Sequence, residues 1–332
     1  WIMAYTTIDD PSAYFQTTIY TGNGGTNAIT NSGNSDLQPD LVWLKERSSA
    51  GAGLLFDAVR GATKFVRSSD AAAEVTAADT LTAFNSDGFT LGADASNYAA
   101  NQNSETYVAW NWKKVAGVFD IQTYSGASNT RTISHNLGVV PKAMIFKRLD
   151  DGAWIVYHAD AGGADKYLVL NTNAAVDTAT TLFNNTVPTS SVFSVGNTNS
   201  TNGSGIDYVV YLIGNKQGVS KCGSYTGNGN ADGTFVYTGF KPAWIMIKGT
   251  NIARNWGIND TKRSPINQTQ DSLYANVSDA ETGSGNYIDF LSNGFKLRDS
   301  ALTMNGAYNY IYMAFAENPF VTGASAIPAT AR

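Results

Sequence analysis

Tyr20-Thr-Gly-Asn-Gly24 is the stretch that decides the fold, because the chain contains it again at steps of about one hundred residues. The later copies are Tyr124-Ser-Gly126 and Tyr225-Thr-Gly-Asn-Gly229. About 100 residues can close a core of their own, unlike the shorter units of solenoids and propellers. Other landmarks keep the same step, namely a proline before an apolar segment (Pro39, Pro141, Pro242), a lysine closing it (Lys45, Lys147, Lys248) and a later tyrosine (Tyr107, Tyr208, Tyr310). The sequence therefore predicts three copies of one module.

The repeats divide the 332 residues into five parts. We expect an N-terminal arm (1–13), three repeats (14–115, 116–216 and 217–318) and a C-terminal tail (319–332). The joints between the repeats are short and contain no Pro/Ser-rich linker, so the modules should pack end to end or around a shared axis, as a rigid rod or wedge. Met3-Ala4 is typical of a translation start, which would make Trp1 and Ile2 either foreign to the natural chain or a reading error.

Composition favours β-structure and excludes several classes of partner. Charged residues make up only 15% of the chain, and 32 glycines accompany many Asn, Ser and Thr, as in sandwiches with many tight turns. The net charge of −5 leaves no basic footprint for nucleic acid. No apolar run reaches the roughly 18 to 20 residues of a membrane span. A single cysteine, Cys222, excludes an intrachain disulfide and a thiolate metal site.

Strand signals occur in the same order in each copy. An opening strand is followed by an inner strand that is apolar on both faces, a short strand and a last strand whose alternate residues are apolar. In the three copies, the ranges are 17–20, 119–124 and 221–225; 41–44, 143–146 and 244–247; 54–56, 154–157 and 256–258; and 107–112, 208–213 and 310–315. We therefore expect an all-β fold of three tandem antiparallel β-sandwich repeats, jelly-roll-like in type.

Late in the outer copies, Asp-Gly and Asn-Gly turns predict hairpins over 84–89 and 290–295. The middle copy differs, because 183–193 contains Pro188 and extra residues, so its turn must be wider. Only 71–81 has a helical period.

The chain holds few groups for catalysis, and none recurs. His135 and His158 are the only histidines, and both belong to the middle copy. We expect a hydrogen-bonding role in a loop for His135. His158 shares its column with Asp57 and Asp260, which predicts a polar strand end that pairs with a donor such as the lysine column; a ligand-facing pocket is the alternative.

Carboxylates and glycine turns give no stronger signal. Asp9-Asp10, Asp150-Asp151 and Asp279/Glu281 could hold calcium but lack the alternating oxygen ligands of an EF-hand loop, so solvated surface charge is expected. The glycine turns lack a P-loop lysine and are explained as hairpin turns. We expect no catalytic residue, no cofactor and no metal.

Aromatic residues divide into two groups. Most recur in core columns and should pack there: Trp43, Trp110, Trp112, Trp244 and Trp256. Tyr20, Tyr124 and Tyr225 border exposed turns and are the candidates for contact with a ligand or glycan, although a structural role is favoured for them too.

The opening Met3-Ala-Tyr-Thr-Thr-Ile-Asp-Asp-Pro-Ser-Ala-Tyr-Phe-Gln-Thr17 resembles a family of repeat proteins encoded by marine tailed phages, as do Tyr20-Thr-Gly-Asn-Gly24 and Pro39-Asp-Leu-Val-Trp-Leu-Lys45. The resemblance covers essentially the whole chain. Further segments that resemble the family are Phe56-Asp57, Arg60-Gly-Ala-Thr-Lys64, Asp87-Gly-Phe-Thr-Leu91, Thr106-Tyr-Val-Ala-Trp110, the run 221–242 and Pro328-Ala-Thr-Ala-Arg332. Ile133-Ser-His-Asn-Leu-Gly-Val-Val-Pro-Lys142 is also similar to segments of phage tail fibres.

The resemblance implies a non-enzymatic virion structural protein of the fibre or appendage type, with no catalytic residues to carry over. Its expected partners are further copies of itself, as a trimer or higher homo-oligomer, other virion proteins and a host-surface glycan; its expected location is the surface of the particle. Alternatives are a capsid or neck decoration protein, a carbohydrate-binding protein and an extracellular filament subunit. A glycan-degrading enzyme is the remaining alternative.

Overall fold

The computed structural model describes residues 6–283, 285, 287–321 and 329–330. It is nearly all β-structure, and every strand pair is antiparallel, so the predicted all-β, antiparallel class of fold is confirmed. The helices of the described residues are one-turn pieces, η1 (Pro11–Ala13), η2 (Ala159–Ala161) and α1 (Asn199–Asn202), and none is long and apolar enough to cross a membrane. The helical expectation for 71–81 is wrong, because that segment contains β6 (Val75–Thr76) and the start of β7 (Leu81–Asn85).

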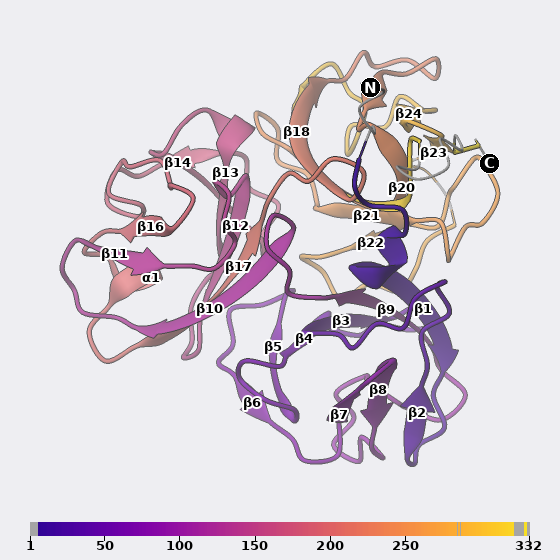
Figure 1. The fold of residues 1–332 in the computed structure, drawn as a ribbon, viewed down its shortest axis with the longest axis horizontal. Helices are drawn as coiled ribbons and strands as arrows, with labels where there is room; N and C mark the ends of the chain where they lie inside the picture. Colours follow the sequence, from indigo (N-terminus) through magenta and orange to yellow (C-terminus); the bar gives the residue numbers. More distant parts are fainter. Residues whose placement is uncertain (1–5, 284, 286, 322–328, 331–332) are drawn as a thin grey trace.

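Figure 1 shows three lobes around a common centre. We call them the first, second and third units and define them by their strands. The first unit contains β1 (Phe15–Thr21), β2 (Asn27–Ile29), β3 (Leu41–Glu46), β4 (Leu54–Asp57), β5 (Lys64–Arg67), β6 (Val75–Thr76), β7 (Leu81–Asn85), β8 (Gly88–Leu91) and β9 (Thr106–Trp112).

The second unit contains β10 (Phe119–Ser125), β11 (Arg131–Ser134), β12 (Ala143–Arg148), β13 (Ile155–His158), β14 (Lys166–Val169), β15 (Asp177–Thr178), β16 (Val192–Val195) and β17 (Asp207–Ile213). The third contains β18 (Ser220–Thr226), β19 (Phe235–Tyr237), β20 (Phe240–Gly249), β21 (Gly257–Asp260), β22 (Leu273–Tyr274), β23 (Ile288–Leu291), β24 (Gly294–Leu297) and β25 (Asn309–Pro319). β25 ends one residue past the predicted boundary at 318.

The large sheets of the three units have matching strand orders: β1-β9-β3-β4-β5-β6, β10-β17-β12-β13-β14-β15 and β18-β25-β20-β21-β22. In each, the last strand of the unit lies between the opening and the inner strand. Smaller sheets accompany them, with the orders β2-β8-β7, β11-β16 and β19-β24-β23. These shared orders support the interpretation of the chain as three copies of one module.

Each large sheet is covered on both faces, which explains why its inner strand has no polar face. In β3, all six residues are buried. Val42 and Leu44 join the core that the first unit forms with its own small sheet. Leu41 and Trp43 instead join a core to which all three units contribute. The predicted burial of the inner strands on both sides is confirmed.

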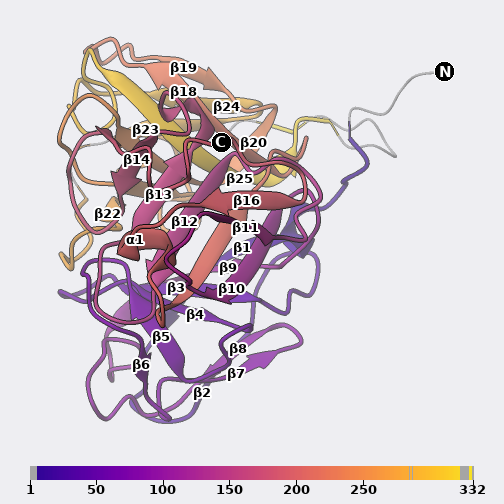
Figure 2. The same ribbon diagram turned by 90° about the vertical axis from the view of Figure 1, so that its left-hand side faces the viewer.

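The common core fixes how the units sit relative to one another. It is built from the recurring apolar columns. The five tryptophans that were expected to pack there are each at most 3% exposed. A void of only about 20 Å³ remains among its aromatic and aliphatic side chains. The end-to-end rod is therefore wrong: the units pack around a shared axis, as Figures 1 and 2 show from two directions.

Tight reversals between the units make this arrangement possible. Gly117 and Gly218 both have φ of 84°, a conformation that favours glycine. Isolated bridges close each reversal, Val115 with Phe119 and Lys216 with Ser220. The chain therefore turns directly from one unit into the next without a linker.

The late turns follow the expectations. β7–β8 and β23–β24 are hairpins, and the turn of the second unit is wider. There β16 pairs only with β11, while Phe183 stays 1% exposed in the core of that unit.

Candidate functional site: the polar belt between the units

Three completely buried polar side chains end equivalent strands and form hydrogen bonds to the following unit. They are Asp57 at the end of β4, His158 at the end of β13 and Asp260 at the end of β21. The Tyr211 hydroxyl of the second unit donates to Asp57 at 2.9 Å. The Trp110 indole N–H of the first unit donates to Asp260 at 3.0 Å. Because the third unit thus bonds back to the first, the contacts close a ring. We call Asp57, His158, Asp260 and the groups that bond to them the polar belt.

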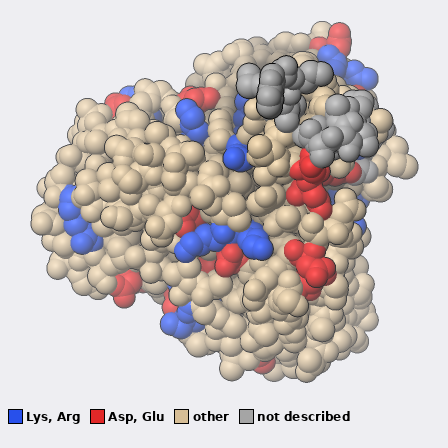
Figure 3. All heavy atoms as spheres, viewed as in Figure 1, with Lys and Arg blue, Asp and Glu red and all other residues tan. Residues whose placement is uncertain are grey.

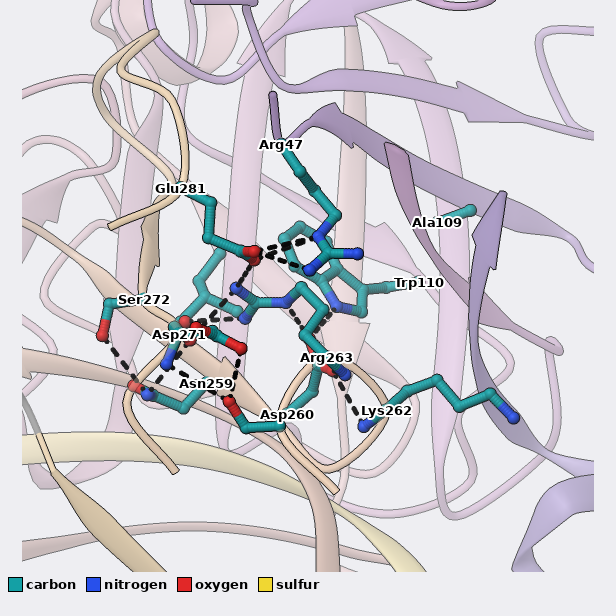
Figure 4. Close-up of polar contacts among 12 residues, drawn as sticks. Arg47, Ala109, Trp110, Asn259, Asp260, Lys262, Arg263, Asp271, Ser272 and Glu281 are labelled. Carbon is teal, nitrogen blue, oxygen red and sulfur yellow. Dashed lines mark hydrogen bonds and ion pairs between the residues drawn. The ribbon is translucent and has the colours of Figure 1, made fainter. Parts of the chain in front are cut away.

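Arg263 neutralises the buried Asp260 carboxylate (Figure 4). Its Nε donates to Asp260 Oδ2 at 2.6 Å, and its Nη1 donates to Glu281 at 2.7 Å. Nη1 also donates to the Asp271 carbonyl at 3.1 Å, and Nη2 donates to the Ile258 carbonyl at 3.0 Å. The side chain is 0% exposed, so these groups replace water entirely.

The network of Arg263 continues into the first unit. Glu281 accepts a bidentate pair from Arg47, with a shortest contact of 2.7 Å, and the Arg263 guanidinium lies 5.8 Å from the Trp110 ring centre. Burial alone would lower the pKa of Arg263, but Asp260 and Glu281 raise it above its ordinary value. The guanidinium is therefore a permanent charge within the joint between the third and first units.

Arg60 occupies the same position between the first and second units. It donates to Asp57 at 2.5 Å, to Glu74 at 2.9 Å and to the Leu55 carbonyl at 2.9 Å. It also lies 3.3 Å from the Tyr211 hydroxyl. Burial opposes its charge, and Tyr211, Asp57 and Glu74 hold its pKa above the ordinary value.

The joint between the second and third units replaces this ion pair with a neutral group. His158 Nε2 lies 3.2 Å from the Tyr312 carbonyl, and its Nδ1 accepts from the Asp160 backbone N–H at 3.2 Å. Ala161 stands three residues later, where the other units have arginine. Burial lowers the pKa of His158 to about 4, so the imidazole stays neutral at pH 7.

The predicted partnership between this column and the lysine column is wrong. Lys45, Lys147 and Lys248 are completely buried and donate to backbone carbonyls instead. Each lysine also reaches the preceding unit of the ring, where its acceptors are the carbonyls of Val277 at 2.8 Å, Ala71 at 3.2 Å and Asn173 at 3.2 Å, respectively. Burial lowers the pKa of each of these lysines to about 8.

The three candidate tyrosines are placed alike in their units. Each ring is half-buried and stacks on the tyrosine that opens the last strand, with centroids 5.0 to 5.2 Å apart. Each hydroxyl donates to a backbone carbonyl: Tyr20 to Ala100, Tyr124 to Thr201 and Tyr225 to Met304. The structure does not bring the three together at one place. Their contact with a glycan stays a prediction, and their hydroxyls already brace the loop before the last strand.

His135 has the predicted loop role. Its Nε2 lies 3.1 Å from the Thr189 carbonyl, and its Nδ1 accepts from the Leu137 N–H at 3.2 Å. Cys222 is a free, buried thiol, and burial raises its pKa.

The description of Glu281 as solvated surface charge is wrong, because its side chain is 12% exposed and pairs with two arginines. Asp150 is exposed, as predicted, and pairs with Arg148. No group of three or more His, Cys, Asp or Glu among the described residues is arranged to hold a metal ion.

Residues Arg60 and Arg263 were missed as members of the belt by sequence reasoning. The available signal was their position: an arginine stands three residues after each aspartate, whereas an alanine stands three residues after the histidine. Where the column has a charged aspartate an arginine accompanies it, and where the column has a neutral histidine the arginine is absent. The distant acids Glu74 and Glu281 could not be assigned in this way, because only the fold brings them to the arginines.

A family model described as "Domain of unknown function (DUF7483)" matches residues 10–319. The chain belongs to the DUF7483 family. The match extends over η1 and all the strands from β1 to β25, so the DUF7483 domain comprises the three-unit ring rather than a single unit. No curated protein and no solved structure matches the chain.

Proposed function

We propose that the chain is a non-enzymatic structural protein of a tailed-phage virion, a tail-associated fibre or adhesin-type appendage exposed on the particle. The observation that carries the proposal is the closure of three β-units into one rigid block. A display protein must hold its surface in a fixed shape, and the block does so without disulfides. The resemblance of the sequence to phage appendage proteins supplies the location.

Rigidity follows from the joints. Each joint combines the common apolar core with buried polar bonds and one equivalent backbone hydrogen bond of 2.8 to 2.9 Å. These backbone bonds run from Glu74 N to Leu149 O, from Val176 N to Thr250 O and from Glu281 N to Arg47 O. One unit cannot rotate against another without exposing apolar surface and breaking the buried hydrogen bonds between units, those of Asp57 and Asp260 and those of the lysines. The block therefore moves as a whole.

The surface agrees with a role in assembly rather than in nucleic-acid binding. On the face in Figure 3, charged side chains are sparse and the two signs lie near one another. The proposed partners are other virion proteins, further copies of the chain as a trimer or higher homo-oligomer, and a host-surface glycan.

Immunogold labelling of particles of the phage that encodes the chain tests the location. Label on the tail or its appendages is the expected result, together with tryptic peptides of the chain in purified particles. Absence of both would defeat the proposal. Label at icosahedral copy number on the capsid would instead support a decoration protein, and label at the neck a neck decoration protein.

Two measurements on the purified protein test the remaining parts. Light scattering after size exclusion should report a homo-oligomer, and a stable monomer that binds neither particles nor cells would count against an appendage. Release of reducing ends from host polysaccharide would overturn the non-enzymatic assignment. Growth of fibres from the protein alone would favour a filament subunit.

A carbohydrate-binding protein is the second candidate. The observation that favours it is the exposure of aromatic side chains on β19, where Phe235 is 44% exposed and Tyr237 is 48% exposed.

A further inference from the structure

A groove of about 340 Å³ lies beside the joint between the second and third units. Asp160, in η2, is the residue of the second unit that lines the groove. The other walls come from β18, β19 and β25, and include Lys221, Phe235, Tyr237 and Tyr312. The volume is at the lower end of the range of small-ligand sites, roughly 300 to 1,000 Å³.

The exposed aromatics of this groove have no counterpart in the other units. Val236 pairs with Phe295 across the small sheet, as Ile29 pairs with Phe89 and Ile133 with Phe193. This register places Ala28 and Thr132 at the position of Phe235, and Thr30 and Ser134 at the position of Tyr237. Side chains that serve the shared fold recur, so this exposed pair serves something specific to the third unit.

Tyr312 contributes a hydroxyl to the same groove. Tyr312 is 3% exposed, and its hydroxyl has no hydrogen-bond partner among the described residues, although it lines the groove. Gly223 gives this ring its space, because a Cβ there would lie 2.6 Å from the hydroxyl oxygen. The register places Ala109 and Val210 at the position of Tyr312 in the other units. A hydroxyl that faces the groove can both donate to and accept from a bound group.

Polar groups surround the aromatic pair. Lys221 Nζ donates to the Tyr237 carbonyl at 2.8 Å and lies 5.2 Å from the centre of the Tyr237 ring, which holds that ring in place. Asp160 and Ser224 are exposed on the walls. They offer a carboxylate acceptor and a hydroxyl that both donates and accepts.

We propose that this groove binds a pyranose ring of a neutral saccharide. A pyranose presents an apolar C–H face that packs on aromatic rings and a rim of hydroxyls that needs donors and acceptors. The exposed Asp160 carboxylate disfavours acidic sugars. An extended peptide fits less well, because strand addition needs free edge carbonyls and Lys221 already occupies that of Tyr237 on the edge strand β19.

The inference deepens the proposed function by naming the chemistry of the host-surface partner, and it rests on that function only for the source of the saccharide. Saturation-transfer NMR on the full chain tests it with the methyl glycosides of glucose, galactose, mannose and N-acetylglucosamine as probes. At least one should bind, and its affinity is then measured by titration.

The key variant is the double substitution Phe235→Thr with Tyr237→Ser. It introduces the residues that the second unit carries at the same strand positions, so the strand should still fold. We expect the affinity to fall at least tenfold. Tyr312→Phe removes only the hydroxyl and should weaken binding about three- to tenfold. Val187→Thr, at a residue 59% exposed elsewhere, is the matched control and should bind as the parent protein does.

The proposal is overturned if none of the four glycosides binds, or if the double variant and Tyr312→Phe both bind as tightly as the parent protein. Binding of an unstructured peptide in place of sugar, abolished by the double variant, would also overturn it. Immunogold labelling separates this result from the proposed function. If the protein binds a saccharide but is absent from particles, the proposal for the groove stands and the proposed virion role is wrong. If it is incorporated into particles but binds no saccharide, the virion role stands and the proposal for the groove is wrong.

Discussion

Replacing Arg263 by alanine should be among the most destabilising single changes in this chain. The guanidinium is 0% exposed and neutralises Asp260, which is also 0% exposed. After truncation, the Asp260 carboxylate keeps only the Trp110 indole and backbone N–H donors as partners. Glu281 keeps its bidentate contact with Arg47 and is less affected.

The magnitude follows from the uncompensated charge. Removing one partner of a buried ion pair costs about 3 to 5 kcal/mol, because the other charge stays away from water. Two lost carbonyl contacts and the packing against Trp110 act in the same direction. We therefore expect about 4 kcal/mol of lost unfolding free energy, and a fall in Tm of about 6 °C. Urea and thermal unfolding followed by circular dichroism measure both quantities.

The second unit provides a matched rescue. It carries His158 and Ala161 where the third unit carries Asp260 and Arg263. The double variant Asp260→His with Arg263→Ala removes both charges together and leaves a neutral imidazole whose Nδ1 can accept from the backbone N–H two residues later, as that of His158 does. It should recover at least half of the loss. A single variant that loses less than about 1 kcal/mol, or a double variant no more stable than the single one, would refute the electrostatic account of this joint.

Three further predictions concern His158, the buried lysines and the loop that Tyr225 braces. Burial lowers the pKa of His158 to about 4, so between pH 6.5 and 4 the unfolded chain binds a proton that the folded chain does not. Unfolding free energy should therefore fall by up to about 3 kcal/mol on acidification across that range. Urea titrations at several pH values measure this fall, and His158→Gln should remove it. The buried lysines have pKa values of about 8 and act in the alkaline range. Unfolding free energy should rise between about pH 8 and 10.5, because the unfolded chain keeps protons there that the folded chain has released. Lys248→Met should reduce this rise, and an unchanged dependence of unfolding free energy on pH would contradict the prediction. Tyr225→Phe should cost about 1 kcal/mol by removing the 2.5 Å bond to the Met304 carbonyl, and a stability equal to that of the parent protein would remove its bracing role.

Local sequence patterns predicted the strands because those patterns depend on neighbouring residues alone. Alternation placed the last strands, continuous apolar runs placed the inner strands, and Asp-Gly and Asn-Gly turns placed the hairpins. The helical expectation for 71–81 failed because two residues of that segment pair as β6 with β5, a tertiary contact that overrides local periodicity. The N-terminal residues Trp1 and Ile2, whose origin we questioned, lie outside the described residues.

The polar belt was predictable only in part. The column of Asp57, His158 and Asp260 emerged from the spacing of the repeats, and its burial at strand ends is confirmed. Its partners did not emerge, because Tyr211 and Trp110 belong to other units and lie about 150 residues away in the chain. The groove was missed for the same reason: Phe235, Tyr237 and Tyr312 are ordinary strand residues until the register shows that their equivalents are small, polar or aliphatic.

The sequence by itself determined an all-β chain with strand signals at a period of about one hundred residues, because hydrophobic alternation and turn residues act locally. The closure of these strands into a ring around one core, the polar groups that bond across the joints and the surface features particular to the third unit depend on the tertiary structure. Those features depend on pairs of residues far apart in the chain, whose free energy of interaction exists only once the apolar faces have excluded water.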